Sequence, residues 1–418
     1  MKQRKPGKEQ FKLLYITYET FPTFRVDLTQ LFSAELAGRG HSIDWVMRSQ
    51  HAGPNRLEQI SPTERVFVGV ARPGQGLWDR VRNQLYALIH DVRIWGIVRR
   101  GDYDFIQVRD KFFASLVGLA AARAKGIPFF YWMSFPYPEA DLLRASEDKD
   151  TLPRFNRYFY YARGFLTSLI LYKIILPHAD HVFVQSDQMK KEVAEHAIAE
   201  DKMTPVPMGV NLALIDPERI QRSSDGRLAG KLPVVYAGTL IKARRMDFLI
   251  QAFKTVVERV PNAVLVLVGD ADADDMQFLY NTAEELGLRD SVIFTGFIPM
   301  DQAWGYIRSA SLCVSPFRPC QTLNSASPTK LVEYMAWGKP VVANDHPDQG
   351  KVLSESGAGL AVPYDPAAFA NAIVELLTDA PRSEEMGERG KDYVLKYRSY
   401  TPLAELVERT YQRLLDVR

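Results

Sequence analysis

The stretch SPTKLVEYMAWGKPVVAND, residues 327–345, contains a short helical pattern followed at once by a buried strand pattern. Ser327 is a favourable residue before a helix, and proline at the next position is favoured in the first helical turn. The apolar run at residues 340–343 has the length and the branched side chains of a parallel strand. A helix joined to a strand by so short a connection is typical of folds in which helices cover a parallel sheet.

Strand-like and helical patterns alternate on both sides of this stretch, and such alternation predicts parallel βαβ units. A segment that contains Pro and Gly, residues 206–217, separates the pattern into two sets. The apolar runs of strand length lie at residues 12–17, 43–49, 65–71, 104–109, 128–134 and 181–186, and then at 234–239, 263–270, 292–297, 312–317, 340–345 and 359–362.

The two sets predict an α/β protein with two Rossmann-like, doubly wound parallel-sheet domains that face each other across a cleft. We expect the first domain at residues 1–205 and the second at residues 206–395. A last helical segment, residues 396–418, is expected to return to the first domain.

Composition is that of an ordinary globular protein of 418 residues, with a net charge of +2 that gives no reason to expect a nucleic acid partner. The two cysteines, Cys313 and Cys320, exclude a disulfide framework and a zinc site built from clustered cysteines. The first ten residues are basic and polar. We find no run of about 20 apolar residues, so we expect no signal segment, no membrane-spanning helix and a cytoplasmic protein.

The helix that begins near Ser327 has the features of an anion-binding site. Exposed N–H groups at a helix start attract phosphate oxygens, and Thr329 and Lys330 add a hydroxyl and a positive charge. Glu333 lies four residues after Thr329, so both residues face the same side of the helix. A carboxylate there could accept hydrogen bonds from ribose hydroxyls, and the set fits a nucleoside diphosphate. The alternative is a well-started helix without a ligand.

A second basic segment points to the same ligand. In VVYAGTLIKARRMDFLIQAF, residues 234–253, Gly238 ends a strand, where the backbone can approach a ligand closely. Lys242, Arg244 and Arg245 follow just before a helix, and arginine suits diphosphate oxygens. The alternative is a solvated basic turn.

Three motifs of the second half resemble glycosyltransferase family 4, a family of retaining enzymes with the two-domain GT-B fold. PMGVN at residues 207–211 resembles the family's linker pattern Pro-x-Gly-Val-Asp. GTLIKARRMDFLI at residues 238–250 matches the spacing of its Gly-Arg-Leu…Lys-Gly-x-Asp-x-Leu-Ile segment. VIFTGF at residues 292–297 matches its Val-x-Phe-x-Gly pattern near the base. The resemblance covers residues 180–395.

The resemblance implies roles for single residues of the donor site. Arg244 falls on the family's diphosphate-binding lysine, whereas Thr239 stands where the family has an arginine. Glu333 matches the second glutamate of the family's Glu-x7-Glu motif, which binds the ribose. Ser325 stands at the first, which contacts the donor sugar. The implied donor contacts are Gly238, Thr239, Lys242, Arg245, Gly296, Phe297, Ser327, Pro328, Thr329 and Lys330.

The first half resembles the family only in its pattern of elements. Its loop WMSFPYPE, residues 132–139, resembles a loop of some surface-polysaccharide transferases, which implies that Glu139 orients an acceptor hydroxyl. The alternative is a solvated glutamate on a loop stiffened by proline. The predicted catalytic set is therefore Arg244, Glu333, Ser325 and Glu139.

These residues and the resemblance together predict a retaining, metal-independent glycosyltransferase without a cofactor. Its donor would be a nucleoside-diphosphate sugar, and its acceptor a glycan or a polyprenol-diphosphate-linked glycan of surface polysaccharide assembly. Two alternatives stay open: a catalytically degenerate GT-B partner subunit, which Ser325 favours, and a nucleotide-sugar isomerase. The donor base, the donor sugar and the acceptor are not specified by the sequence.

Three further segments have a composition that suggests a ligand or a membrane. The acidic run DADADD, residues 270–275, could suggest a metal site, but it lies between a strand and a helix, where aspartate is a natural cap. Residues 77–100 and 154–176 mix aromatic, aliphatic and basic side chains. Either segment could lie in a membrane interface at the inner face of the plasma membrane, or form a core helix.

Overall fold

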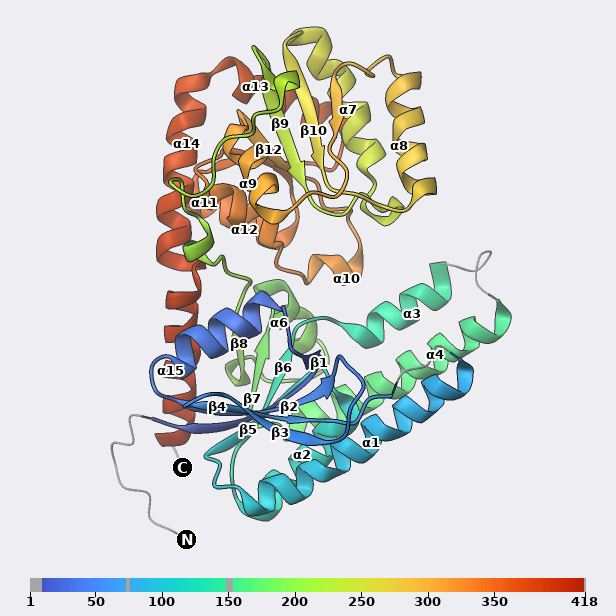
Figure 1. Ribbon diagram of the computed structural model, residues 1–418, viewed down its shortest axis with the longest axis vertical. Helices are drawn as coiled ribbons and strands as arrows, with labels where there is room; N and C mark the ends of the chain where they lie inside the picture. The colour runs from blue at the N-terminus through green and yellow to red at the C-terminus, as the bar shows by residue number, and fades with distance from the viewer. Residues whose placement is uncertain (1–9, 73–75, 148–152, 417–418) are drawn as a thin grey trace. The chain divides into compact units, whose positions relative to one another are not determined.

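The computed structural model describes residues 10–72, 76–147 and 153–416 (Figure 1). The chain divides into two compact units. Unit 1 contains the chain up to Pro207 and again from Tyr400 onward, and unit 2 contains Met208–Ser399. The basic N-terminal segment, residues 1–9, lies outside the described residues.

Unit 1 is built on an eight-stranded sheet with the order β3-β4-β2-β1-β5-β6-β7-β8. Only the β3–β4 pair is antiparallel among the described strand pairs. The strand order reverses at β1, which pairs with β2 on one side and β5 on the other. The strands are β1 (Lys12–Phe21), β2 (Ser42–Ser49), β3 (Arg56–Ser61), β4 (Glu64–Val68), β5 (Phe105–Arg109), β6 (Phe129–Met133), β7 (His181–Val184) and β8 (Met203–Pro205).

Alternate residues of these strands enter two different cores, because successive side chains of a strand point to opposite faces. Leu14 and Ile16 pack in the core on one face, while Leu13 and Tyr15 pack on the other. The first core is covered by α1 (Leu77–Arg100), α2 (Phe112–Lys125), η2 (Ile170–Ile175), α5 (Leu176–His178) and α6 (Asp187–Ala194). The second is covered by η1 (Asp27–Ala37) and α15 (Tyr400–Asp416).

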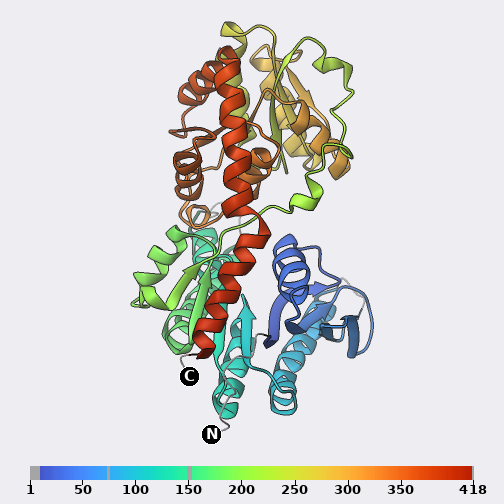
Figure 2. The same cartoon turned by 90° about the vertical axis from the view of Figure 1, so that its left-hand side faces the viewer.

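Helix α15 is the last element of the chain and belongs to unit 1. Figure 2 shows it, in red, lying across the sheet of this unit. Tyr411 is buried among Phe105, Phe130 and Phe183, and its hydroxyl hydrogen-bonds Gln107 at 2.5 Å. These aromatic contacts fix the helix on the sheet.

Helices α3 (Tyr137–Glu147) and α4 (Arg154–Leu169) pack against each other in unit 1. Helix α4 continues through η2 and α5, which gives one helical stretch from Arg154 to His178. By length and composition this stretch could cross a membrane, and the expectation that the chain has no membrane-spanning helix stays a prediction. Aromatic residues and single polar residues interrupt its apolar run, and for that reason the sequence pattern missed it.

Unit 2 is built on a six-stranded parallel sheet with the order β11-β10-β9-β12-β13-β14. The strands are β9 (Leu232–Ala237), β10 (Ala263–Val268), β11 (Val292–Phe294), β12 (Leu312–Ser315), β13 (Val341–Asn344) and β14 (Gly359–Val362). One core lies under α7 (Met246–Arg259), α8 (Ala273–Glu285) and α13 (Pro366–Thr378). The other lies under α9 (Met300–Ser309), α11 (Thr329–Ala336) and α12 (Pro347–Ser356).

The predicted fold class, two doubly wound α/β domains, is confirmed. Strand β3 was not predicted, because its sequence RLEQIS is too polar to stand out and it lies at a sheet edge. The prediction that Ser327 caps a helix is wrong: α11 begins at Thr329, and Pro328 precedes it without a side-chain cap. The capping interpretation of the acidic run is confirmed, because the Asp272 carboxylate accepts from Asp275 N at 2.9 Å.

A buried polar cluster ties together the first and last segments of unit 2. Arg398, in η7 (Val394–Arg398) after α14 (Ala380–Tyr393), donates to Asp348 Oδ2 at 2.8 Å and to Ser327 Oγ at 2.9 Å. Ser327 Oγ donates to Asp348 and accepts from Met208 N at 3.0 Å. Although burial alone would raise it, Arg398 and Ser327 hold the pKa of Asp348 below its usual range. The cluster therefore holds the start of unit 2 at Met208 and its end at Arg398 against Ser327, which lies just before α11.

We predict that Arg398→Met lowers the free energy of unfolding by about 3–5 kcal/mol, because it leaves the Asp348 charge buried without its partner. Urea denaturation followed by circular dichroism measures this change. The exposed pair Arg382–Glu375 is the matched control, and Arg382→Ala should change stability by less than about 1 kcal/mol. Equal effects of the two substitutions would contradict the assignment, whereas Arg398→Met/Asp348→Leu should restore part of the loss.

Candidate functional site

Four of the predicted site residues, Gly238, Arg244, Lys330 and Glu333, lie at the carboxyl end of β9, where the strand order of unit 2 reverses between β10 and β12. Ligands of doubly wound sheets bind at such a switch point. Helix α11 packs on this end of the strand: Ala237 N donates to the Tyr334 hydroxyl oxygen at 2.8 Å. The helix turn that carries Lys330 and Glu333 is thereby held against Gly238.

Lys330 extends across the end of β9. Its Nζ donates to the Tyr236 hydroxyl at 2.8 Å and lies 4.5 Å from the centroid of the Tyr236 ring. Gly238 has a φ of +148°, and a Cβ there would lie 2.3 Å from Lys330 Nζ, so the lysine occupies the space that a side chain would need. Burial, together with the Arg244 charge, lowers the pKa of Lys330 to about 7, and Glu333 opposes this shift.

Arg244 brings a second positive charge to the same place. It lies in the short turn η6 (Lys242–Arg244), and its guanidinium is 5.7 Å from the centroid of the Phe317 ring. Its charge contributes to the lowered pKa of Lys330, which shows that the two cations lie near each other. Among the described residues, neither cation forms an ion pair with a carboxylate. Two cations that form no ion pair are a suitable site for a polyanion such as a diphosphate.

Glu333 lies on α11 close to these cations. Burial raises the pKa of its carboxyl group, and Lys330 opposes the shift. Within the part of the chain that the structure describes, no hydrogen bond to this carboxylate is found. A half-buried carboxylate without a hydrogen-bond donor fits a role in accepting hydrogen bonds from a ligand.

Some of the other predicted donor residues already make contacts within unit 2, and others are exposed. Arg245 has φ +53° and pairs with Asp247 at 2.9 Å, and the backbone N of Lys242 donates to Asp275. Ser327 already makes the hydrogen bonds of the buried cluster, so its hydroxyl points into unit 2. Ser325 is fully buried. Near the predicted base site, Gly296 has a φ of +67° and Phe297 is 85% exposed. The roles of these residues, and of Thr239, Pro328 and Thr329, stay predictions.

Glu139 lies in the first turn of α3 in unit 1. Its Oε1 accepts from the Tyr172 hydroxyl at 2.7 Å, and its Oε2 is buried without a hydrogen-bond partner. The alternative interpretation, a solvated surface glutamate, does not fit this burial. Its predicted role toward an acceptor stays a prediction.

The sequence analysis missed a charged cluster at the carboxyl end of β5, beside the switch point of unit 1. Arg109 is buried and lies 2.7 Å from Asp27, and Asp110 accepts from Ser134 N at 3.0 Å. Asp110 has a φ of +52°, a conformation that side-chain-bearing residues rarely adopt and that often marks functional sites. Burial raises the pKa of Asp110 despite Arg109 and Ser134. The signal was present as an Arg-Asp pair directly after an apolar run.

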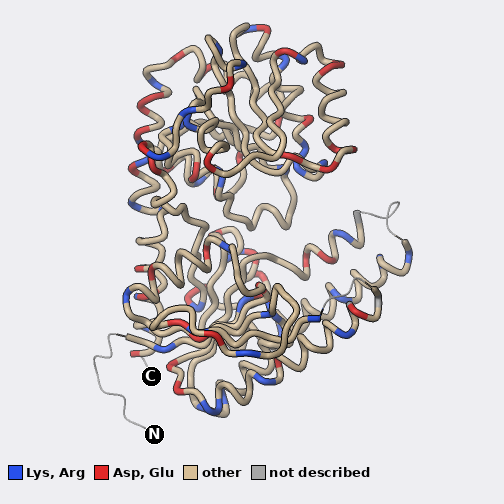
Figure 3. The backbone as a smooth tube through the Cα atoms, viewed as in Figure 1, with Lys and Arg blue, Asp and Glu red and all other residues tan. Residues whose placement is uncertain are grey.

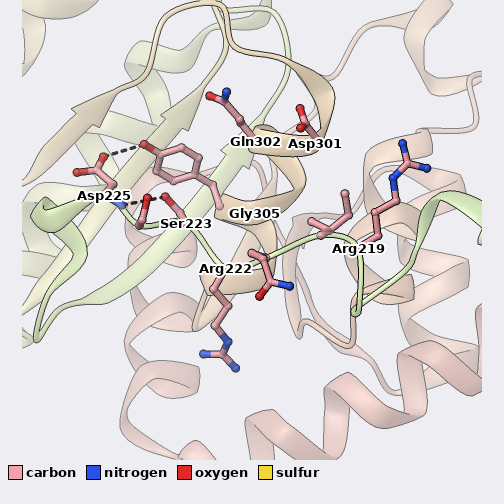
Figure 4. A pocket seen from close by; sticks show the side chains of 11 residues that line it. Arg219, Arg222, Ser223, Asp225, Asp301, Gln302 and Gly305 are labelled. Atoms are coloured by element: carbon pink, nitrogen blue, oxygen red, sulfur yellow. Dashed lines mark hydrogen bonds between the residues drawn. The ribbon is translucent and has the colours of Figure 1, made fainter.

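A pocket of about 550 Å³ lies elsewhere in unit 2, between α9 and the segment before β9 (Figure 4). Arg219, Arg222, Asp225 and Asp301 are among its lining residues, and the Tyr306 hydroxyl donates to Asp225 at 2.7 Å. None of the predicted donor residues lines it. We assign it no role, because its arginines are near the surface and Asp225 is already paired with Arg227.

Comparison with known proteins gives two matches that together cover most of the chain. Residues 28–214 match the model described as glycosyltransferase family 4, and residues 231–379 match the model described as glycosyl transferases group 1. Over 296 residues, the chain is 26% identical to the alpha-monoglucosyldiacylglycerol synthase of Streptococcus pneumoniae. This match covers 69% of the chain and 62% of that protein.

Solved structures show the same fold. Sucrose-phosphate synthase from Thermosynechococcus elongatus superimposes with a TM-score of 0.71 at 20% identity, over 98% of this chain and all of that one. Anabaena Alr3699/HepE, solved in complex with UDP-glucose, superimposes with a TM-score of 0.64 at 17% identity, over 96% of this chain and all of that one. At these identities the likeness establishes the GT-B fold alone.

We predict that pyrophosphate binds about tenfold more weakly at pH 8.5 than at pH 7. Free Lys330, with a pKa of about 7, is increasingly neutral above that pH, and a bound anion favours its charged form, so binding takes up a proton. Isothermal calorimetry in buffers of different ionisation enthalpy measures both the affinity and the proton uptake. Lys330→Met is the control: proton uptake that persists in this variant would show that another group titrates.

Proposed function

Because the chain belongs to the family 4 glycosyltransferases, we propose that it transfers a sugar from a nucleoside-diphosphate sugar to an acceptor hydroxyl. The observation that supports this most directly is that Lys330 and Arg244, two cations that form no ion pair, lie beside the half-buried Glu333 at the switch point of unit 2. The cations suit the diphosphate, and the carboxylate suits the ribose hydroxyls. HepE, whose structure was solved with UDP-glucose, makes UDP the first nucleotide to test.

We propose that the reaction retains the anomeric configuration. The acceptor oxygen would bond to the anomeric carbon on the face that the diphosphate leaves, while the bond to the diphosphate breaks. The acceptor proton would leave on a diphosphate oxygen, so no protein nucleophile is needed. Lys330 and Arg244 would stabilise the negative charge that develops on the leaving group, and a single contact of this kind contributes about 2.7–4 kcal/mol in other enzymes. We expect these cations to suffice without a metal ion or a cofactor.

For the acceptor we propose a glycan or a polyprenol-diphosphate-linked glycan in surface polysaccharide assembly, reached from the inner face of the plasma membrane. The printed name of one relative, a monoglucosyldiacylglycerol synthase, describes a lipid acceptor for that protein. This supports a lipid-linked acceptor as a class without naming it. In unit 1, Glu139 has a buried oxygen that lacks a partner and could orient the acceptor hydroxyl.

A non-catalytic GT-B partner subunit is the second candidate. It is favoured by Ser325, a fully buried serine at the position where the family carries a glutamate that contacts the donor sugar. An assay of nucleoside-diphosphate release from the nucleotide sugar separates the two proposals. A transferase releases the diphosphate only when an acceptor is added, whereas a partner subunit binds the nucleotide sugar and releases no diphosphate. The same assay also separates a transferase from an isomerase.

We predict that UDP, GDP or ADP binds selectively and that Glu333→Ala weakens this binding about 10- to 100-fold, the effect of losing hydrogen bonds to a charged group. Calorimetry of the wild type and the variant, with EDTA present, measures it. Glu284→Ala, a change of an exposed glutamate on α8, is the matched control and should leave binding unchanged. If no nucleoside diphosphate binds the wild type, the donor-site assignment is wrong and the partner-subunit proposal takes its place.

A further inference from the structure

Helix α4 presents a continuous stripe of apolar side chains to solvent. Phe155 is 80% exposed, and most of the exposed apolar residues that follow it in α4 lie on the same side of the helix at about 100° per residue. A soluble helix normally presents its polar side outward, so this stripe needs a partner. Its members are Phe155, Tyr158, Phe159, Phe165, Leu166 and Leu169.

Helix α1 presents a second stripe of the same kind. Trp78 is 83% exposed, and the exposed apolar residues again follow helical spacing along the whole helix. The opposite side of α1 is in the core of unit 1, through Ile94, Ile97 and Val98. The helix is therefore apolar on two sides. The exposed members are Trp78, Val81, Leu85, Leu88, Ile89, Val92 and Trp95.

The two stripes belong to the same helical layer of unit 1. Helix α1 packs against α2, and η2, the continuation of α4, packs against α2 as well. In η2, Leu171, Tyr172 and Ile175 are buried, so this end of the long helix is anchored in the core. The stretch Arg154–His178 has the length and composition to cross a bilayer, but a helix anchored in this way is suited to lie along a surface.

The charges on both helices are strongly biased toward Lys and Arg. The stretch Arg154–His178 contains four Lys or Arg residues and no Asp or Glu. Helix α1 contains five Arg and two Asp, and one of the two, Asp91, is buried in an ion pair with Lys111. At a spacing of 100° per residue, Arg82, Arg93 and Arg100 follow one margin of the α1 stripe. Figure 3 shows α4 tan along most of its length, in keeping with its low charge.

We propose that these two stripes, here called the docking face, bind the surface of a bilayer that contains anionic phospholipids. Aromatic side chains are favoured at the boundary between headgroups and acyl chains, and arginines at the margin can bind lipid phosphates. A face of this aromatic and basic composition fits a lipid surface better than a second protein copy, because two such faces would bring like charges together. The inference rests on the proposed function, because docking would bring unit 1 to a lipid-linked acceptor.

Tryptophan fluorescence reports directly on this face. The chain has six tryptophans, and four of them, Trp45, Trp132, Trp304 and Trp337, are buried. The exposed two, Trp78 and Trp95, both lie in the α1 stripe. We expect a blue shift of emission, and quenching by brominated acyl chains, when the protein is mixed with vesicles of phosphatidylcholine containing phosphatidylglycerol. Trp78→Phe should remove a large part of both signals.

Vesicle co-sedimentation with matched variants tests the face itself. Phe155→Ser/Phe165→Ser should lower the partition coefficient more than tenfold, because two exposed aromatic side chains no longer enter the lipid. Arg93→Gln/Arg100→Gln should lower it about fivefold for each charge removed, with anionic vesicles only and less at high salt. Phe278→Ser/Leu395→Ser changes two exposed apolar residues of unit 2 and should leave the partition unchanged. Thermal unfolding of each variant shows whether its fold is intact.

Three outcomes would overturn the proposal. The wild type could fail to bind vesicles of phosphatidylcholine both with and without phosphatidylglycerol. The Phe155→Ser/Phe165→Ser variant could bind as well as the wild type. The protein could also form a dimer, measured by light scattering, that this variant dissociates, with no vesicle binding; the occupant would then be a second copy. Vesicle binding needs neither donor nor acceptor, so it is scored independently of nucleotide binding. The docking face can therefore be disproved while the proposed transferase activity stands, and the transferase activity can be disproved while the docking face stands.

Discussion

Two positive charges that form no ion pair, at the carboxyl end of one strand, are the constraint on which the proposed site depends. Lys330 is held over the Tyr236 ring by a hydrogen bond to its hydroxyl, and Arg244 approaches from the turn that follows the strand. Burying a cation is unfavourable, and the lowered pKa of Lys330 expresses that cost. An anionic ligand would relieve it, which supports the proposed diphosphate site.

The surrounding structure keeps this arrangement in place. Gly238 leaves room for the lysine side chain, and the Tyr334 hydroxyl holds α11 on the end of β9. Immediately before α11, the cluster of Ser327, Asp348 and Arg398 fixes the start of the helix from inside unit 2. Ser327, which the sequence suggested as a donor contact, makes the hydrogen bonds of this cluster, and its role toward a donor stays a prediction. The residues that we propose to face the ligand are the lysine and the glutamate further along the helix.

Sequence reasoning could propose a donor site because its candidate residues lie in two short segments that follow or precede strands. It identified Gly238, Arg244, Lys330 and Glu333, which the structure places around one strand end. It did not distinguish Arg245 from Arg244, because only the structure shows that Arg245 adopts a positive φ and pairs with Asp247. It also missed Asp110, because the conformation and burial that single out this residue arise from packing between β5 and β6.

The sequence by itself determined the fold class, the division into two α/β units and the family, because alternating hydrophobic patterns and short motifs are local properties of the chain. The tertiary structure decided which charges remain unpaired and which apolar residues remain exposed. Arg244 and Arg245 are chemically identical, and the aromatic residues of α4 resemble those of a core helix. Arg245 differs from Arg244 in its backbone conformation and its ion pair with Asp247, and α4 differs from a core helix in how much of its apolar surface stays exposed. Neither the conformation nor the packing follows from residue type.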